Sequence, residues 1–330
     1  MTKISEIICA TSVMLGSIIG AGFLSGKELT GFFGLEGYPF FLFCAAILFV
    51  FCYFAIFRSI KNGNKIINSK FVKISSLISD FVFSVGCVGG INYIQKVFLK
   101  SVGCFGGGFS LPILSALTFV LAEPMIKKIS VIEKINACLL PICLVIVNAI
   151  AIKSGASFNI FAATRLKKDG FSYIVKIIKA LLYVFTNVFA AVPVLTALTD
   201  NKTEKSLKIS SMIFGALFFL QAFVILSAIS VNPQSICEDM PIFVLVKNGA
   251  MGVMFLLVMY IGIFTSLCSF YYPVFKITKN DKSIKAAAVI FILALSMMGV
   301  SAIIKYLYPI VGVIGGVVFI KIIKNGIKKR

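Results

Sequence analysis

Three glycines within seven residues interrupt the first long apolar segment, which spans residues 7–33; residues 16–22 read GSIIGAG. Glycine weakens a helix, and unwound backbone inside a membrane is tolerated only where it is buried in protein or lines a cavity. An opened turn would present the amides of Ala21, Gly22 and Phe23 at the start of a half-helix, where a carboxylate is favoured. Carbonyl groups just before the break would face a cation.

The same glycines also fit a packing role. Gly16 and Gly20 are four residues apart, as are Gly22 and Gly26. This spacing is typical of close contacts between two membrane helices. Taken alone, the stretch leaves both binding and packing open.

A second irregular stretch lies in the sixth apolar segment, at residues 183–193. Thr186 and Asn187 are polar within an apolar run, and Pro193 removes a backbone donor. Interrupted segments in corresponding positions of two halves point to a binding site in transporters. We therefore expect the sixth helix to be unwound like the first, with Thr186 and Asn187 binding the solute.

Two adjacent hydroxyl groups, those of Thr265 and Ser266, follow Gly262 in the eighth apolar segment. Hydroxyl oxygens are suitable ligands for a small cation. The alternative is ordinary, because Ser and Thr in membrane helices often bond to a carbonyl of their own helix.

Three further polar residues are candidates. Asp80 is an acid within an apolar segment, where acids are functional candidates by default, but it lies near enough to the inner end to reach the interface or a lysine. Asn92, on the same segment, is expected to face the cavity. Lys134 opens the fifth segment, where an interfacial role competes with one in which its charge replaces a coupling ion.

The composition is that of a helical membrane protein. The 330 residues are 59% hydrophobic and 13% charged, with a mean hydropathy of +1.04. The net charge is +20, and the cations lie in short loops between apolar runs. Cations in such loops orient a membrane protein and contact anionic lipid head groups, which explains them better than nucleic-acid binding does. Histidine is absent, which excludes a Ser-His-Asp triad and His-ligated metals, and we expect no enzyme activity.

Ten membrane segments are predicted from the apolar runs. They are residues 7–33, 39–57, 74–99, 105–122, 132–152, 174–199, 209–230, 243–272, 284–302 and 306–323. With the N-terminus inside, 21 of the 32 Lys and Arg residues fall on the inner side. This bias predicts that both termini are cytoplasmic.

The longest connection, residues 153–173, divides a single membrane domain into two sets of five segments. Because five is odd, the two halves insert with opposite orientation. The sequence therefore predicts inverted repeats at about residues 3–153 and 171–325, with a binding site at their interface.

Several of these motifs resemble one family. Residues 16–23, 25–28 and 32–33 resemble the first helix of the YkvI-like bacterial membrane proteins, of the amino acid–polyamine–organocation transporter superfamily. Asp80 with the glycines after it, and residues 182–195, are also similar to that family. The resemblance implies an all-α LeuT-type fold, with five plus five helices and unwound helices one and six.

The resemblance also implies site residues. In sodium-coupled relatives, carbonyl groups at the helix-one break and a carbonyl with two hydroxyls on helix eight hold an ion. By position these are Gly16, Ile19, Gly262, Thr265 and Ser266. Amino-acid transporters of the superfamily bind the substrate carboxylate at the turn that corresponds to residues 20–22.

The expected function is secondary active transport of a small solute, an amino acid or related amine, by alternating access in a bacterial plasma membrane. Coupling to sodium is favoured over coupling to protons. No cofactor is expected beyond a sodium ion, and the expected partners are the lipid bilayer and the solute. The alternative is a membrane receptor subunit of the same fold, which binds a ligand without transporting it.

Overall fold

The structure is a computed structural model, and it describes residues 3–62, 69–101, 110–126, 129–156, 170–201, 203–247, 249–278 and 281–328. Throughout this described part of the chain, the regular secondary structure is helical. Lys134 belongs to a described helix, but its side chain lies outside the described residues, as does that of Ala21.

Six helical spans of the described chain are long and apolar enough to cross a membrane. They are α4 (Tyr38–Lys61), α5 (Lys70–Ser101), α8 (Gly170–Asn201), α9 (Glu204–Val231), α11 (Ala250–Thr278) and a final span of α13 (Val300–Ala302), the π-helical η4 (Ile303–Leu307) and α14 (Tyr308–Lys328). The other elements are α1 (Lys3–Ile18), α2 (Ala21–Leu24), α3 (Lys27–Phe33), α6 (Ser110–Ile126), α7 (Ile129–Lys153), η3 (Pro233–Cys237), α10 (Pro241–Val244) and α12 (Lys282–Ser296). This helical content is compatible with a polytopic membrane protein.

The outer face of α4 illustrates why a bilayer suits this chain. Phe40, Phe43, Ile47 and Phe51 are each 53–58% exposed and follow one another at helical spacing. A continuous stripe of large exposed apolar side chains is unfavourable in water and favourable against lipid. The opposite face of α4 packs into the protein core through residues such as Phe49.

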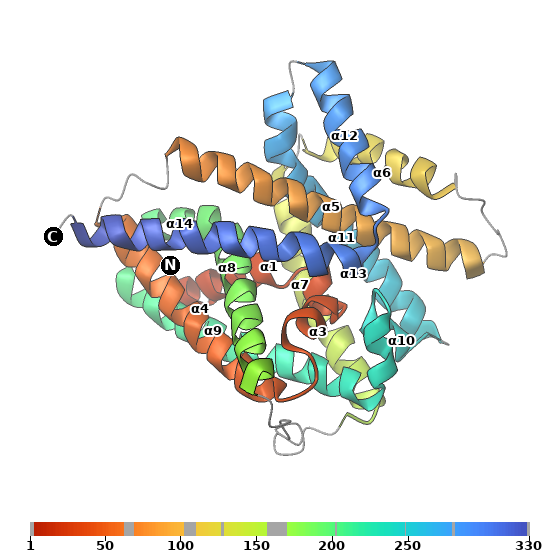
Figure 1. The fold of residues 1–330 in the computed structure, drawn as a ribbon, viewed down its shortest axis with the longest axis horizontal. Helices are drawn as coiled ribbons and strands as arrows, with labels where there is room; N and C mark the ends of the chain where they lie inside the picture. Colours follow the sequence, from red (N-terminus) through yellow and green to blue (C-terminus); the bar gives the residue numbers. More distant parts are fainter. Residues whose placement is uncertain are drawn as a thin grey trace.

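The helices gather into two neighbouring groups (Figure 1). In one group, α4 packs against α8 and α9, and α14 packs against α8. In the other, α11 packs against α5 and α7, and α12 packs against α5. Gly312 allows the close approach of α14 to α8, because a Cβ atom there would lie 2.7 Å from the carbonyl oxygen of Leu182.

The sixth segment differs from the prediction. Helix α8 is continuous through residues 183–193, so the expectation of an unwound sixth helix is wrong. The hydroxyl of Thr186 donates to the carbonyl of Leu182 (2.7 Å), and the amide of Asn187 donates to that of Tyr183 (3.0 Å). These side chains therefore bond within their own helix, which explains how polar residues occur there without a break.

A break does occur in the last part of the chain. Helix α12 ends at Ser296, and Gly299 adopts a positive φ of 82° before α13 begins. The predicted segment 284–302 therefore extends beyond its helix. The predicted segment 243–272 also starts too early, because its helix begins at Ala250 and continues to Thr278.

Candidate functional site

The predicted break in the first segment is confirmed. Helix α1 ends at Ile18, and α2 begins at Ala21. Between them, the amide of Gly20 donates to the carbonyl of Ile18 at 2.8 Å, a pairing too short for an α-helix. The backbone therefore opens where the glycines of residues 16–22 weaken it.

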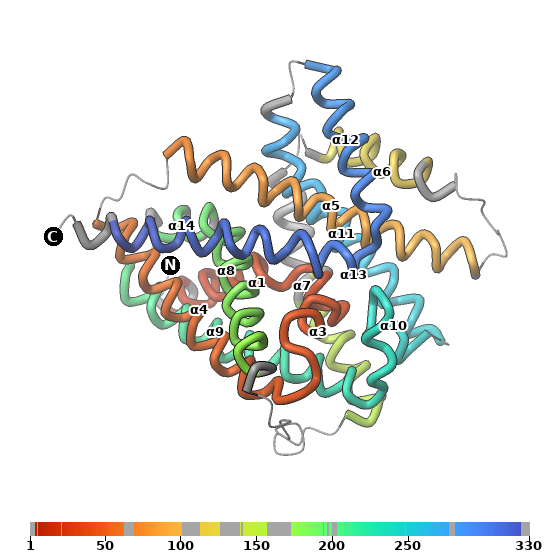
Figure 2. The backbone as a smooth tube through the Cα atoms, viewed as in Figure 1, coloured from red at the N-terminus to blue at the C-terminus, as the bar shows by residue number. Residues whose placement is uncertain are grey.

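A second turn follows at once, between α2 and α3. Gly26 adopts a φ of 81°, which favours glycine, and a Cβ atom there would collide with the side chain of Ile229. The hydroxyl of Ser25 donates to the carbonyl of Gly22 at 3.0 Å and so steadies the turn. Figure 2 traces the chain from α1 through this turn into α3.

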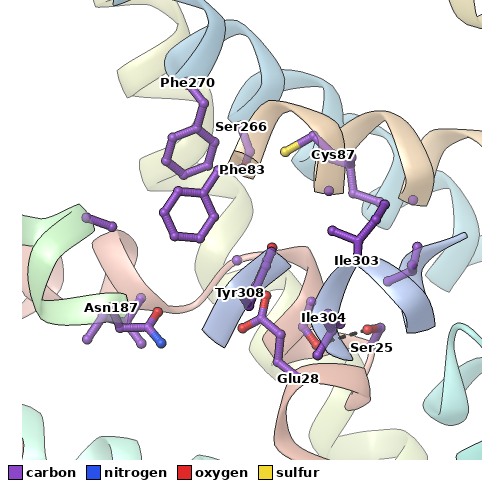
Figure 3. Close-up of a pocket in the computed structure, with 18 of the residues that line it drawn as sticks. Ser25, Glu28, Phe83, Cys87, Asn187, Ser266, Phe270, Ile303, Ile304 and Tyr308 are labelled. Carbon is purple, nitrogen blue, oxygen red and sulfur yellow. Dashed lines mark hydrogen bonds between the residues drawn. The ribbon is translucent and has the colours of Figure 1, made fainter. Parts of the chain in front are cut away.

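The turn brings Glu28 back toward the break. The side chain of Glu28 is only 8% exposed, and a Cβ atom on Gly22 would overlap its carboxyl group. The phenol of Tyr308 lies beside this carboxyl group, and the two side chains face each other in Figure 3. Gly86 makes room for the phenol, because a Cβ atom at Gly86 would lie 2.9 Å from the hydroxyl of Tyr308.

These groups line a pocket of about 100 Å³ (Figure 3). Its walls come from the first segment, α5, α8, α11 and the last span, and the polypeptide just before α10 contributes Asp239 and Met240. Apart from the two acids Glu28 and Asp239, the described polar side chains that line it are neutral: Ser17, Ser25, Asn187, Ser266 and Tyr308. The described lining therefore contains two acidic side chains and no basic one.

The chain around η3 and α10 is tied to the turn. The ammonium group of Lys27 donates to the carbonyls of Ile236 (2.7 Å) and Glu238 (2.8 Å), and the amide of Ile242 donates to the carbonyl of Ser25 (3.1 Å). The ammonium group of Lys27 is thus bound to backbone carbonyls beside the pocket.

Asp239 is held by the start of the last span. Its carboxylate accepts hydrogen bonds from the amide of Ser301 (2.9 Å) and from the hydroxyl of the same residue. Both bonds are accepted by the same oxygen of Asp239, Oδ1.

Five residues expected at the site do line the pocket, namely Gly16, Gly20, Gly22, Asn187 and Ser266. The sequence motifs from segments one, six and eight are therefore brought together in space. Two other candidates from segments one and six lie elsewhere. Phe23 is fully buried, with its ring 5.9 Å from that of Phe218, and Thr186 bonds to the carbonyls of Leu182 and Tyr308.

The remaining ion-site candidates are more dispersed. The hydroxyl of Thr265 donates to carbonyls of its own helix, those of Ile261 (3.1 Å) and Gly262 (3.0 Å). Gly262 faces Leu139 of α7, and Ile19 is buried outside the pocket lining. Of the five expected ion ligands, Gly16 and Ser266 therefore line the pocket. The other three are Ile19, Gly262 and Thr265, and they lie outside the lining.

Asn92 and Asp80 also lie outside the pocket lining. The amide of Asn92 donates to the hydroxyl of Ser296 (3.1 Å), and its carbonyl oxygen accepts from Ser115, so it links α5 to α12 and α6. Asp80 is half-buried on α5, three residues from the pocket residue Phe83.

The sequence-based prediction missed Glu28, Asp239 and Tyr308. A signal existed for Glu28, since it is an acid inside the first apolar segment. An uninterrupted helix, however, would place it about 9 Å along the axis from Gly22. Only the Gly26 turn brings the two together.

No group of three or more His, Cys, Asp or Glu side chains placed to hold a metal ion occurs in the described part of the chain. The sequence matches no protein-family model and no curated protein sequence.

Proposed function

We propose that this chain is a secondary active transporter of a small solute, an amino acid or related amine, in a bacterial plasma membrane. The observation that carries the proposal is the pocket at the break of the first helix. Broken helices that open into a pocket between packed apolar helices are the usual substrate sites of secondary transporters.

The proposed mechanism is alternating access around this pocket. Gly16 and Ser266 from α1 and α11, and Asn187 from α8, line the same space, so relative motion of these helices would change its exposure. We further propose ten membrane segments in two inverted sets of five, with both termini in the cytoplasm. Coupling to sodium, with Ser266 among the ion ligands, is proposed in preference to coupling to protons.

Uptake by the purified full-length chain in proteoliposomes tests this function. Labelled amino acids and small amines would be supplied with an inward sodium gradient, an inward proton gradient or neither, and protein-free liposomes are the control. We expect at least one solute to accumulate with the sodium gradient and to show counterflow. Binding of a solute without counterflow would contradict transport and would favour the receptor alternative.

A further inference from the structure

We propose that the pocket recognises a small organic ammonium group, and that the carboxylate of Glu28 is the group that binds it. This inference rests on the proposed function only in taking the pocket as the solute site. It assigns the charge, the size and the principal contact of the solute.

The acidic side chains of the pocket favour a cationic solute. Glu28 is buried, and the neutral phenol of Tyr308 lies beside its carboxyl group. Neither Lys nor Arg occurs among the described side chains that line the pocket. A carboxylate offers about four acceptor positions, and a single phenol can fill only one of them. A buried carboxylate without a counter-charge is unfavourable, and a cationic ligand would supply that charge.

Two glycines leave the space in which Glu28 and Tyr308 lie. Gly22 on α2 and Gly86 on α5 each lack the Cβ atom that would displace the carboxyl group of Glu28 or the phenol of Tyr308. Two glycines from separate helices thus allow these two groups to meet at the pocket. The carboxyl group occupies the surface of the turn where a substrate carboxylate was expected, so a second carboxylate there would be repelled. Moreover, α2 is a single turn, which provides little helix dipole for an anion.

Aromatic side chains form part of the pocket wall. Phe83 and Phe270 line the pocket with ring centroids 4.9 Å apart, and the ring of Tyr308 lies 5.3 Å from that of Phe83. Aromatic faces attract organic ammonium groups. A carboxylate beside aromatic rings is better suited to an alkylammonium group than to a bare metal ion, which needs several oxygen ligands.

Size narrows the ligand further. The pocket volume of about 100 Å³ is smaller than the roughly 150 Å³ of an engineered cavity that binds benzene. A primary amine with two or three carbon atoms fits this space. Ethylammonium is therefore a suitable probe.

Thermal unfolding of the purified full-length chain in neutral detergent tests the inference. Ethylammonium chloride, ethanol, sodium acetate and sodium chloride would each be added to a constant background of N-methylglucamine chloride. In the unsubstituted protein we expect ethylammonium to raise the Tm by about 2–4 °C near tenfold saturation. Ethanol, its neutral counterpart, and acetate, its anionic counterpart, should give no comparable rise in Tm.

Substitutions show whether the rise in Tm depends on Glu28. Glu28→Gln should abolish the rise given by ethylammonium, whereas Asp80→Asn, which neutralises an acid outside the pocket lining, should retain it. An equal rise in Glu28→Gln, or a rise with ethanol or acetate equal to that with ethylammonium, would overturn the inference. A Glu28-dependent rise with sodium chloride but not with ethylammonium would also overturn it. Because the comparison of probes uses the unsubstituted protein, it remains decisive if Glu28→Gln does not fold.

This binding assay is independent of transport. A Glu28-dependent rise with no uptake of any solute would leave the ammonium site standing and contradict the transporter. Gradient-driven uptake of an anionic solute that is equally fast in Glu28→Gln would support the transporter and contradict the ammonium site.

Discussion

Two stretches of the chain carry helix-breaking residues, and only one of them breaks. Residues 16–26 open twice, at Ile19 and at Gly26, whereas α8 continues through residues 183–193 in spite of Pro193. The difference lies in what happens to the backbone groups. The first stretch contains four glycines, each of which weakens the helix, whereas α8 has none between residues 183 and 193. The hydroxyls of Thr186 and Thr196 in α8 donate to carbonyls four residues earlier.

The comparison shows that polar residues within a membrane helix do not by themselves indicate an opening. Hydroxyl and amide side chains near a proline can satisfy carbonyl groups of the same helix. Glycines opposite a bulky or charged side chain are more informative. Gly22 faces the carboxyl group of Glu28, and Gly26 faces Ile229. The following substitutions test this contrast.

Gly26→Ala is expected to have the largest effect. A left-handed backbone at a residue with a side chain costs about 1–2 kcal/mol, and the collision with Ile229 adds about 1–3 kcal/mol. The sum predicts a large fall in Tm and the loss of uptake, measured by thermal unfolding and in proteoliposomes. A variant with unchanged Tm would show that the turn does not require glycine.

Gly22→Ala should reduce uptake at least tenfold, which corresponds to about 1.4 kcal/mol. The reason is that the new methyl group displaces the carboxyl group of Glu28. Most of the stability of the protein should remain. Gly249→Ala is the matched control, since Gly249 lies outside the pocket lining and a Cβ atom there meets nothing within 4 Å. Initial uptake rates and the Tm of both variants would be compared. Equal loss of uptake in the two variants would contradict a specific role for the space that Gly22 leaves for the carboxyl group of Glu28.

The sequence was sufficient to predict the first break, because three glycines in a long apolar run weaken the helix locally. Gly16 and Ser266 were expected as ion ligands and Asn187 as a solute contact, and these three residues from distant segments all line the pocket. Six of the predicted membrane segments correspond to long apolar helical spans in the described chain.

The remaining features depend on contacts between distant residues. Glu28 reaches the pocket only because Gly26 turns against Ile229 of α9, and Tyr308 reaches it only because Gly86 of α5 leaves space. Asp239 comes from a loop that is fixed through Lys27 and Ser25. None of these approaches follows from local periodicity.

A smaller effect on uptake is expected from substitutions of the hydroxyl side chains in α11. The hydroxyls of Thr265 and Ser266 were expected to act together, and replacing both by Ala should abolish sodium-dependent uptake. Ser266 lines the pocket, whereas Thr265 donates to carbonyls of its own helix. We therefore expect Ser266→Ala alone to lower sodium-dependent uptake several-fold. Ser269→Ala, whose hydroxyl donates to the carbonyl of Thr265 at 3.1 Å, is the control. A loss in Ser269→Ala equal to that in Ser266→Ala would contradict an ion-binding role.

Pro193→Ala should change uptake least and tests the unbroken helix directly. Pro193 lies inside α8 with its side chain exposed, outside the pocket lining. Alanine restores the backbone donor that proline lacks, so the variant should be as stable as the original chain or more stable, by up to about 3 kcal/mol. Uptake should remain within about twofold, because α8 stays helical and Asn187 stays in the pocket. If Pro193→Ala instead abolished uptake while raising the Tm, α8 would have to open during the transport cycle. The contrast between the two stretches would then hold for one conformation only, and the sixth helix would act as a second hinge.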